Sequence, residues 1–185
     1  MRRNVSLCLL ILLATAAVAQ EGLSPKAGAL SSNLYTNVYF GFNFQVPENW
    51  TVTWVAQNGP CGKDCMLLDV RAPGYPKPAR MISVSAEQVD QGGAVVREAA
   101  AGMTLVSYGA KRMGDPVELS AGGARFFRTD YRSQLADREL LETMIVMPDK
   151  EYAAVFTFAA ESRKALDAMV ANFATAFSKI GAKQP

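Results

Sequence analysis

The chain has 185 residues, 50% of them hydrophobic, with 19 lysines and arginines against 17 aspartates and glutamates. Arg2 and Arg3 account for the whole positive excess, so the rest of the chain offers no basic surplus for nucleic acid or an anionic membrane surface. The sequence contains no histidine, which excludes Ser-His-Asp and Cys-His catalysis and imidazole metal sites.

Residues 1–19 have the pattern of a secretory signal peptide. They begin with two arginines, continue with a short apolar run, and end at the small residues Ala17 and Ala19 before Gln20. We therefore predict a periplasmic or secreted protein, cleaved between Ala19 and Gln20, with no stable membrane insertion after cleavage. An uncleaved anchor is the alternative, but a membrane span needs about 20 apolar residues and this run is shorter.

The segment before the first aromatic residue is rich in glycine, serine and proline. Residues 20–34 lack hydrophobic periodicity, which predicts a flexible linker between the signal and the domain. The length of the chain suits one domain, which we place over residues 35–181, followed by a short tail over 182–185.

Residues 35–55 are the most aromatic part of the chain. Phe40, Phe42 and Phe44 alternate with small or polar residues, which indicates a strand with one aromatic face. A turn follows at Pro47, and a second strand begins at Trp50 and is expected to return beside the first. An aromatic platform that stacks a sugar or a base is one interpretation. The regular alternation favours the other, a hydrophobic layer beneath a helix.

Cys61 and Cys65 are the cysteines that remain after export, and they lie in a loop rich in glycine and proline. In an oxidising compartment a nearby pair normally forms a disulfide. A redox-active pair is the first alternative, although the usual redox spacing is two residues at the start of a helix. A metal site is the second, but two thiolates supply half of a structural zinc shell.

Three prolines within six residues interrupt residues 71–80, so this segment is a stiff exposed loop between two short strands. Such loops carry binding in many proteins, and Tyr75, Lys77 and Arg80 are its candidate partner-binding residues. A simple connection between strands is the alternative, and the commoner case.

Two segments have helical periodicity. Asp90–Tyr108 carries an apolar stripe behind an aspartate cap. The second helix is capped by Ser162, places Phe173, Phe177 and Ile180 on one face, and ends at Gly181.

Between the two helices, residues 117–160 read as antiparallel strands joined by tight turns at Gly122-Gly123, Ala136-Asp137 and Pro148-Asp149-Lys150. The first long strand alternates, with Arg128, Asp130 and Arg132 on its polar face, where we expect cross-strand ion pairs. The last two strands are apolar on both faces and therefore need cover on both. The sequence predicts an α+β fold in which an antiparallel sheet of six or seven strands lies between helices.

The opening hairpin resembles that of PsbP-like domains. The resemblance rests on Tyr35-Thr36-Asn37, Tyr39-Phe40-Gly41-Phe42 and the Val46–Trp50 segment, and it extends in element order over the domain. This superfamily includes a photosystem II subunit, a Ran-binding import factor and periplasmic DcrB-type proteins. The resemblance implies a helix–sheet–helix arrangement, and the superfamily supplies no catalytic motif.

These observations favour an exported, non-enzymatic binding or assembly module of the bacterial cell envelope. Its partner would be a protein or another envelope component, with no nucleic acid, cofactor or metal. A thiol–disulfide redox protein that uses Cys61 and Cys65 is the alternative. A carboxylate-based hydrolase is a third hypothesis, which requires two close acids in a cleft.

Overall fold

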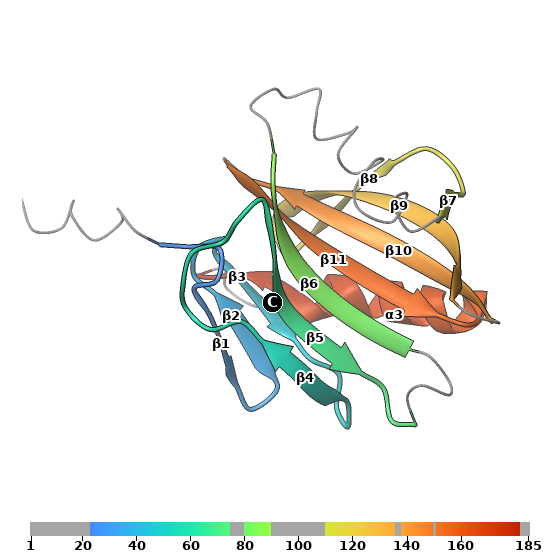
Figure 1. Ribbon diagram of the computed structural model, residues 1–185, viewed down its shortest axis with the longest axis horizontal. Coiled ribbons are helices and arrows are strands. Elements are labelled where there is room, and N and C mark those ends of the chain that lie inside the picture. The colour runs from blue at the N-terminus through green and yellow to red at the C-terminus, as the bar shows by residue number, and fades with distance from the viewer. Residues whose placement is uncertain (1–22, 75–79, 90–109, 136–137, 150, 182–185) are drawn as a thin grey trace, which may run out of the picture.

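The computed structural model describes residues 23–74, 80–89, 110–135, 138–149 and 151–181. The described part is dominated by antiparallel sheet (Figure 1). The larger, eight-stranded sheet has the order β4-β5-β6-β11-β10-β9-β7, with β8 paired to β9. Its strands are β4 (Thr51–Val55), β5 (Asp64–Arg71), β6 (Arg80–Gln88), β7 (Lys111–Arg112), β8 (Val117–Ala121), β9 (Ala124–Leu135), β10 (Arg138–Pro148) and β11 (Tyr152–Ala160).

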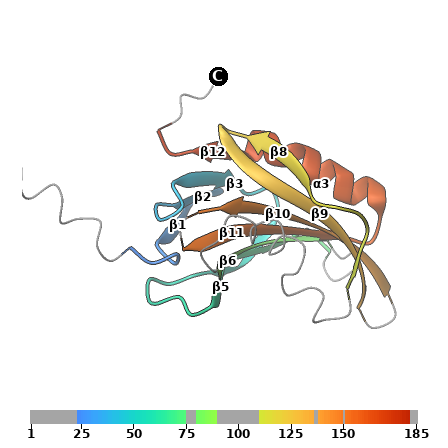
Figure 2. The ribbon, with the colours of Figure 1, turned by 90° about the horizontal axis from the view of Figure 1, so that it is seen from above.

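A second, four-stranded sheet has the order β1-β2-β3-β12. Its strands are β1 (Gly28–Ser31), β2 (Leu34–Asn37), β3 (Phe42–Gln45) and β12 (Phe177–Lys179). The small sheet and helix α3 (Arg163–Ala176) lie on the same side of the large sheet, as Figure 2 shows. Among the described residues, no helix is both long enough and apolar enough to cross a bilayer.

The predicted turn at Gly122-Gly123 is confirmed. Ala121 pairs with Ala124, and both glycines have positive φ angles, +52° and +76°. Two successive residues with positive φ match the right-handed twist of a two-residue hairpin, which explains the pair of glycines. The β10–β11 connection also lies where the sequence predicts it, because Pro148 pairs with Ala153. Residues 136–137 and 150 fall outside the described part.

The prediction that the last two strands of the large sheet are covered on both faces is confirmed. Phe156 and Val155 are neighbours on β11 that point to opposite faces, and both are buried. Phe156 belongs to the main core, between the sheet and the layer of α3 and β3. Val155 belongs to a smaller cluster on the other face, which also contains Val89 and Ala110. The helix predicted over Asp90–Tyr108 lies between these two residues in sequence, outside the described part.

The predicted antiparallel sheet with a helix packed on it is confirmed, although the large sheet has eight strands instead of six or seven. Within the described residues α3 is the single α-helix, and it shares its layer with the small sheet. The sequence did not indicate this sheet because its strands are short. Two of them, β1 and β12, fall in segments that the sequence predicts to be a linker and the end of a helix.

The linker predicted over residues 20–34 is the first correction. Gly28–Ser31 forms β1, which pairs with β2 from Gly28↔Asn37 to Ser31↔Leu34. Glycine at position 28 is required by packing, since a Cβ there would collide with the Tyr35 hydroxyl. The small residues that suggested a flexible segment allow close contact with the Tyr35 ring.

The end of the last helix is the second correction. The helix does not continue to Gly181 but ends at Ala176, and Phe177 is extended, with φ −95° and ψ 135°. Phe177 pairs with Phe44 across β12 and β3, and the Ile180 N–H donates to the Gly41 carbonyl. The spacing of Phe173 and Phe177 fits a helix face, but pairing with β3 gives the last residues a sheet ladder.

Candidate functional site

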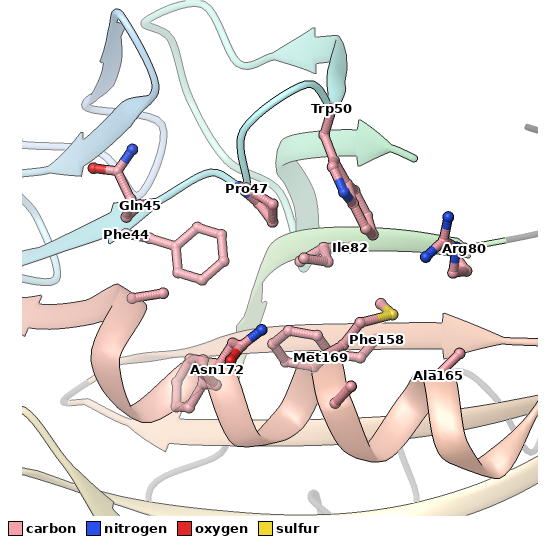
Figure 3. A pocket seen from close by; sticks show the side chains of 13 residues that line it. Phe44, Gln45, Pro47, Trp50, Arg80, Ile82, Phe158, Ala165, Met169 and Asn172 are labelled. Carbon is pink, nitrogen blue, oxygen red and sulfur yellow. The ribbon is translucent and has the colours of Figure 1, made fainter. Parts of the chain in front are cut away.

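An apolar groove lies between α3, the large sheet and the β3–β4 connection (Figure 3). It has a volume of about 230 Å³. It is lined by Phe44, Gln45, Pro47, Trp50, Arg80, Ile82, Phe158, Ala165, Ala168, Met169, Asn172, Phe173 and Ala176. Phe44, Ile82, Phe158 and Phe173 are buried and form an apolar floor. Such a lining favours an apolar ligand group over a polar one.

Small side chains on α3 open the groove. Ser162 caps the helix and accepts a hydrogen bond from the Ala165 N–H at 3.3 Å, as the sequence predicted. Leu166 and Phe173 anchor the helix in the core. Ala165 and Ala168 lie beside these anchors and are too small to fill the space next to the sheet. The same helix therefore covers the core and leaves the groove open along one side.

The β3–β4 connection forms the opposite wall. The Val46 N–H donates to the Asn33 carbonyl at 2.7 Å, and the Trp50 N–H donates to the Pro47 carbonyl at 3.3 Å. Asn49 has a positive φ of 63°, which completes the predicted turn. This turn directs the Trp50 ring toward α3 (Figure 3). The half-buried indole stands over the groove.

Arg80 is the charged side chain of the groove lining. It begins β6 and pairs with Ala160 of β11, and its carbonyl accepts a hydrogen bond from the Ala72 N–H at 3.0 Å. The Nε atom of Arg80 is buried and has no hydrogen-bond partner among the described residues. The polar groups Gln45 and Asn172 lie toward the other end of the groove (Figure 3). The groove is therefore apolar along its floor and cationic at one end.

Of the three predicted partner-binding residues, the structure describes Arg80 alone. Tyr75 and Lys77 lie outside the described part, whereas Arg80 lies in the groove. Sequence reasoning missed the rest of the lining, although the alanines of α3 and the Pro47–Trp50 turn were visible signals. It did place Phe42 and Phe44 in a hydrophobic layer, and both are buried between β3 and the large sheet.

Cys61 and Cys65 form a disulfide, with their Cα atoms 5.6 Å apart. The bridge joins Cys61, in the loop between β4 and β5, to Cys65, the second residue of β5. The Tyr152 hydroxyl donates to the carbonyls of Cys61 and Gly62, at 3.3 and 3.0 Å. The Lys63 carbonyl accepts from the Gln88 N–H at 2.7 Å. The loop is thus fastened to β11 and β6, as a structural bridge requires, and it lacks the helix N-terminus that lowers the pKa of redox cysteines.

The polar face of β9 is organised around Asp130. Its carboxylate accepts hydrogen bonds from Arg128 at 3.0 Å, from Thr143 at 2.8 Å and from Arg163 at 2.9 Å. Burial alone would raise the pKa of Asp130, but these hydrogen bonds and the charge of Arg128 outweigh it and hold the pKa below its usual value. Because Arg163 is the first residue of α3, this cluster ties the helix to the sheet. The expected cross-strand pair is present between Arg132 and Glu139, at 3.5 Å.

Glu142 is a buried acid on β10. Burial raises the pKa of its carboxyl group, and a hydrogen bond from the Ser133 hydroxyl partly opposes this effect. Glu142 pairs with Ala159, one position from the Ala160 that pairs with Arg80, but it does not line the groove. In the described part, no three acids or cysteines gather closely enough to hold a metal ion. The described lining of the groove includes no carboxylate, so the two-acid hydrolase has no support there.

The sequence matches no protein-family model and no curated protein. Solved structures do share the fold. One is cyanobacterial PsbP (CyanoP) from Synechocystis sp. PCC 6803, with a TM-score of 0.56 and 12% identity over 82% of this chain and 98% of that one. Another is LpqN, described as involved in cell envelope biogenesis of Mycobacterium tuberculosis, with a TM-score of 0.50 and 15% identity over 74% of this chain and 82% of that one. The chain has the PsbP-like fold, which confirms the resemblance. The hairpin predicted over residues 35–55 is wrong in its pairing, because β3 pairs with β2 and β12, whereas β4 pairs with β5 in the other sheet.

Proposed function

We propose that this protein is an exported, non-enzymatic binding module of the bacterial cell envelope, and that its groove holds an alkyl chain of an envelope component. The observation that carries the proposal is the open groove of about 230 Å³, floored by four buried apolar side chains and flanked by the Trp50 ring. This volume is smaller than that of a typical drug-sized pocket, which suits part of a ligand.

Support for the location comes from other parts of the chain. The first 19 residues have the pattern of an export signal, and the Cys61–Cys65 disulfide suits an oxidising compartment. LpqN, which shares the fold, is described as acting in envelope biogenesis. The described residues that line the groove carry no carboxylate, hydroxyl or thiol, which favours binding over catalysis.

The test uses Trp50 as a reporter. Trp54 is 54% exposed on β4 and does not line the groove, so Trp54→Phe leaves one tryptophan, at the site. Decanol, an uncharged alkyl chain, should then change the emission of Trp50 in a saturable manner. The absence of a saturable change would refute the proposal.

A matched pair of variants locates the binding. Ala168 lines the groove and Ala171 does not, and both are exposed positions of α3. Ala168→Leu should fill part of the channel and weaken decanol binding by at least about tenfold, since each buried methylene contributes roughly 0.8 kcal/mol. Ala171→Leu should bind as the parent does. Equal decanol affinities for the two variants would show that the alkyl chain binds outside the groove and would contradict the proposal.

A further inference from the structure

We infer that the ligand of the groove is a single-chain aliphatic carboxylate, whose chain lies along α3 and whose carboxylate binds Arg80. This inference rests on the proposed function, because it names the ligand class of the same site. Its first support is charge. Arg80 is the one charged residue among the described groove residues, so an anion meets a cation there without an opposing carboxylate.

The state of the Arg80 side chain is the second support. Its Nε atom is buried and lacks a hydrogen-bond partner among the described residues. A buried donor of a charged group without a partner is costly. A planar guanidinium can donate two parallel hydrogen bonds to a carboxylate, through Nε and one Nη atom, once the Arg80 side chain turns so that Nε faces the groove. A bound carboxylate would therefore accept a hydrogen bond from Nε and balance the charge of Arg80. The uncharged end of an alcohol would not balance that charge.

The shape of the groove is the third support. It follows α3 from Ala165 to Ala176, with Arg80 and Trp50 toward one end and Phe44 toward the other (Figure 3). This course along one helix suits a single extended alkyl chain.

The hydrogen bonding of the walls argues against an extended peptide. Peptides that bind along a sheet usually pair with a free strand edge. The strands that line this groove are paired on both sides: β3 lies between β2 and β12, β6 between β5 and β11, and β11 between β6 and β10. The amide of Gln45 already donates to the Asn33 carbonyl at 3.0 Å. The walls therefore offer contacts for an alkyl chain rather than a main-chain ladder.

The first experiment compares three probes in the Trp54→Phe protein at neutral pH, below their micelle concentrations: decanoate, decanol and decylammonium. Decanoate should bind at least about tenfold more tightly than decanol, and decylammonium should bind more weakly than both. Equal binding of decanoate and decanol would overturn the carboxylate assignment and leave the proposed function standing. Failure of all three to bind would overturn both. This comparison needs no change at Arg80.

The second experiment assigns the preference to Arg80. Arg80→Gln should lower decanoate affinity to that of decanol and leave decanol affinity unchanged. Arg125→Gln is the matched control, since Arg125 is exposed on β9 and does not line the groove; it should keep the full preference. A preference for decanoate that survives in Arg80→Gln, with melting temperature unchanged, would overturn the assignment. So would a loss of the preference in Arg125→Gln.

Discussion

The β8–β9 turn gives the sharpest test of how the two sheets pack. Gly122 and Gly123 both have positive φ angles, +52° and +76°. They differ in their surroundings. A Cβ on Gly122 would lie 2.8 Å from the Phe177 carbonyl oxygen, 2.9 Å from Phe177 Cδ1 and 3.0 Å from Ser178 Cα, whereas a Cβ on Gly123 would meet nothing within 4 Å. Alanine at the two positions therefore separates backbone strain from packing.

The expected magnitudes follow from these distances. Alanine in a left-handed conformation costs about 1–2 kcal/mol, and roughly 0.4–1 kcal/mol of this is offset by the lower entropy of the unfolded chain. Gly123→Ala should thus lower the free energy of unfolding by roughly 1 kcal/mol. Gly122→Ala adds an overpacking cost of about 1–3 kcal/mol. The crowded atoms cannot move freely, because Phe177 pairs with Phe44 and its ring lies 4.9 Å from that of Phe126.

Guanidinium denaturation followed by tryptophan fluorescence measures both variants. Gly122→Ala should be the less stable by about 1–3 kcal/mol, and for a protein of this size each kcal/mol lowers the melting temperature by roughly 2–4 °C. Equal destabilisation of the two variants would show that β12 does not pack on the β8–β9 turn. The contact between the small sheet and the large one would then be wrong in this region.

Three further predictions concern the disulfide and the two perturbed acids. Replacing both Cys61 and Cys65 by serine should cost about 2 kcal/mol by releasing a short loop, seen as a lower melting temperature than that of the oxidised protein, while decanol binding stays unchanged; an unaltered melting temperature would contradict the structural role. Because the pKa of Asp130 is lowered in the folded state, its contribution to stability is present at neutral pH and lost as the pH falls below the usual value of 3.8 and through the folded pKa. Urea denaturation of wild type and Asp130→Asn over a pH series should therefore show a wild-type advantage at neutral pH that disappears in acid, and a constant difference would count against the cluster. Because burial raises the pKa of Glu142 above its usual 4.5, the opposite sign applies: stability is lost as the pH rises through the folded pKa. Glu142→Gln, which can still accept the Ser133 hydrogen bond, should be more stable than wild type at neutral pH and equal to it well below pH 4.5, and the same denaturation series would reject this if the variant were less stable at neutral pH.

Local patterns were enough to predict much of the large sheet. Two consecutive glycines between strands favour a tight hairpin, because glycine readily adopts the positive φ angles that a two-residue turn requires. Apolar residues on both parities of β10 and β11 require cover on both faces. The N-cap at Ser162 was also predictable, because a cap depends on residues within one turn. In each case the determining contacts lie within a few positions along the chain.

The groove could not be predicted in the same way. Its walls come from the β3–β4 connection, the start of β6, β11 and α3, which are far apart in the sequence. The sequence predicts Arg80 to be part of an exposed loop. Its position at the end of the apolar groove depends on the pairing of β6 with β11. In the sequence, the alanines of α3 indicate only a helix. Their part in forming a groove becomes visible when the position of the sheet beside the helix is known.

Near neighbours and the period of hydrophobic residues are enough to predict the Gly122-Gly123 turn, the two-sided strands, the helix cap and the pattern of an export signal. Long-range contacts place Gly28 and Phe177 in a second sheet and Arg80 beside an apolar groove. These features escape local patterns because strand pairing and cavity formation depend on which distant surfaces meet. A hydrophobic period shows that a face will be buried, but it does not show against what.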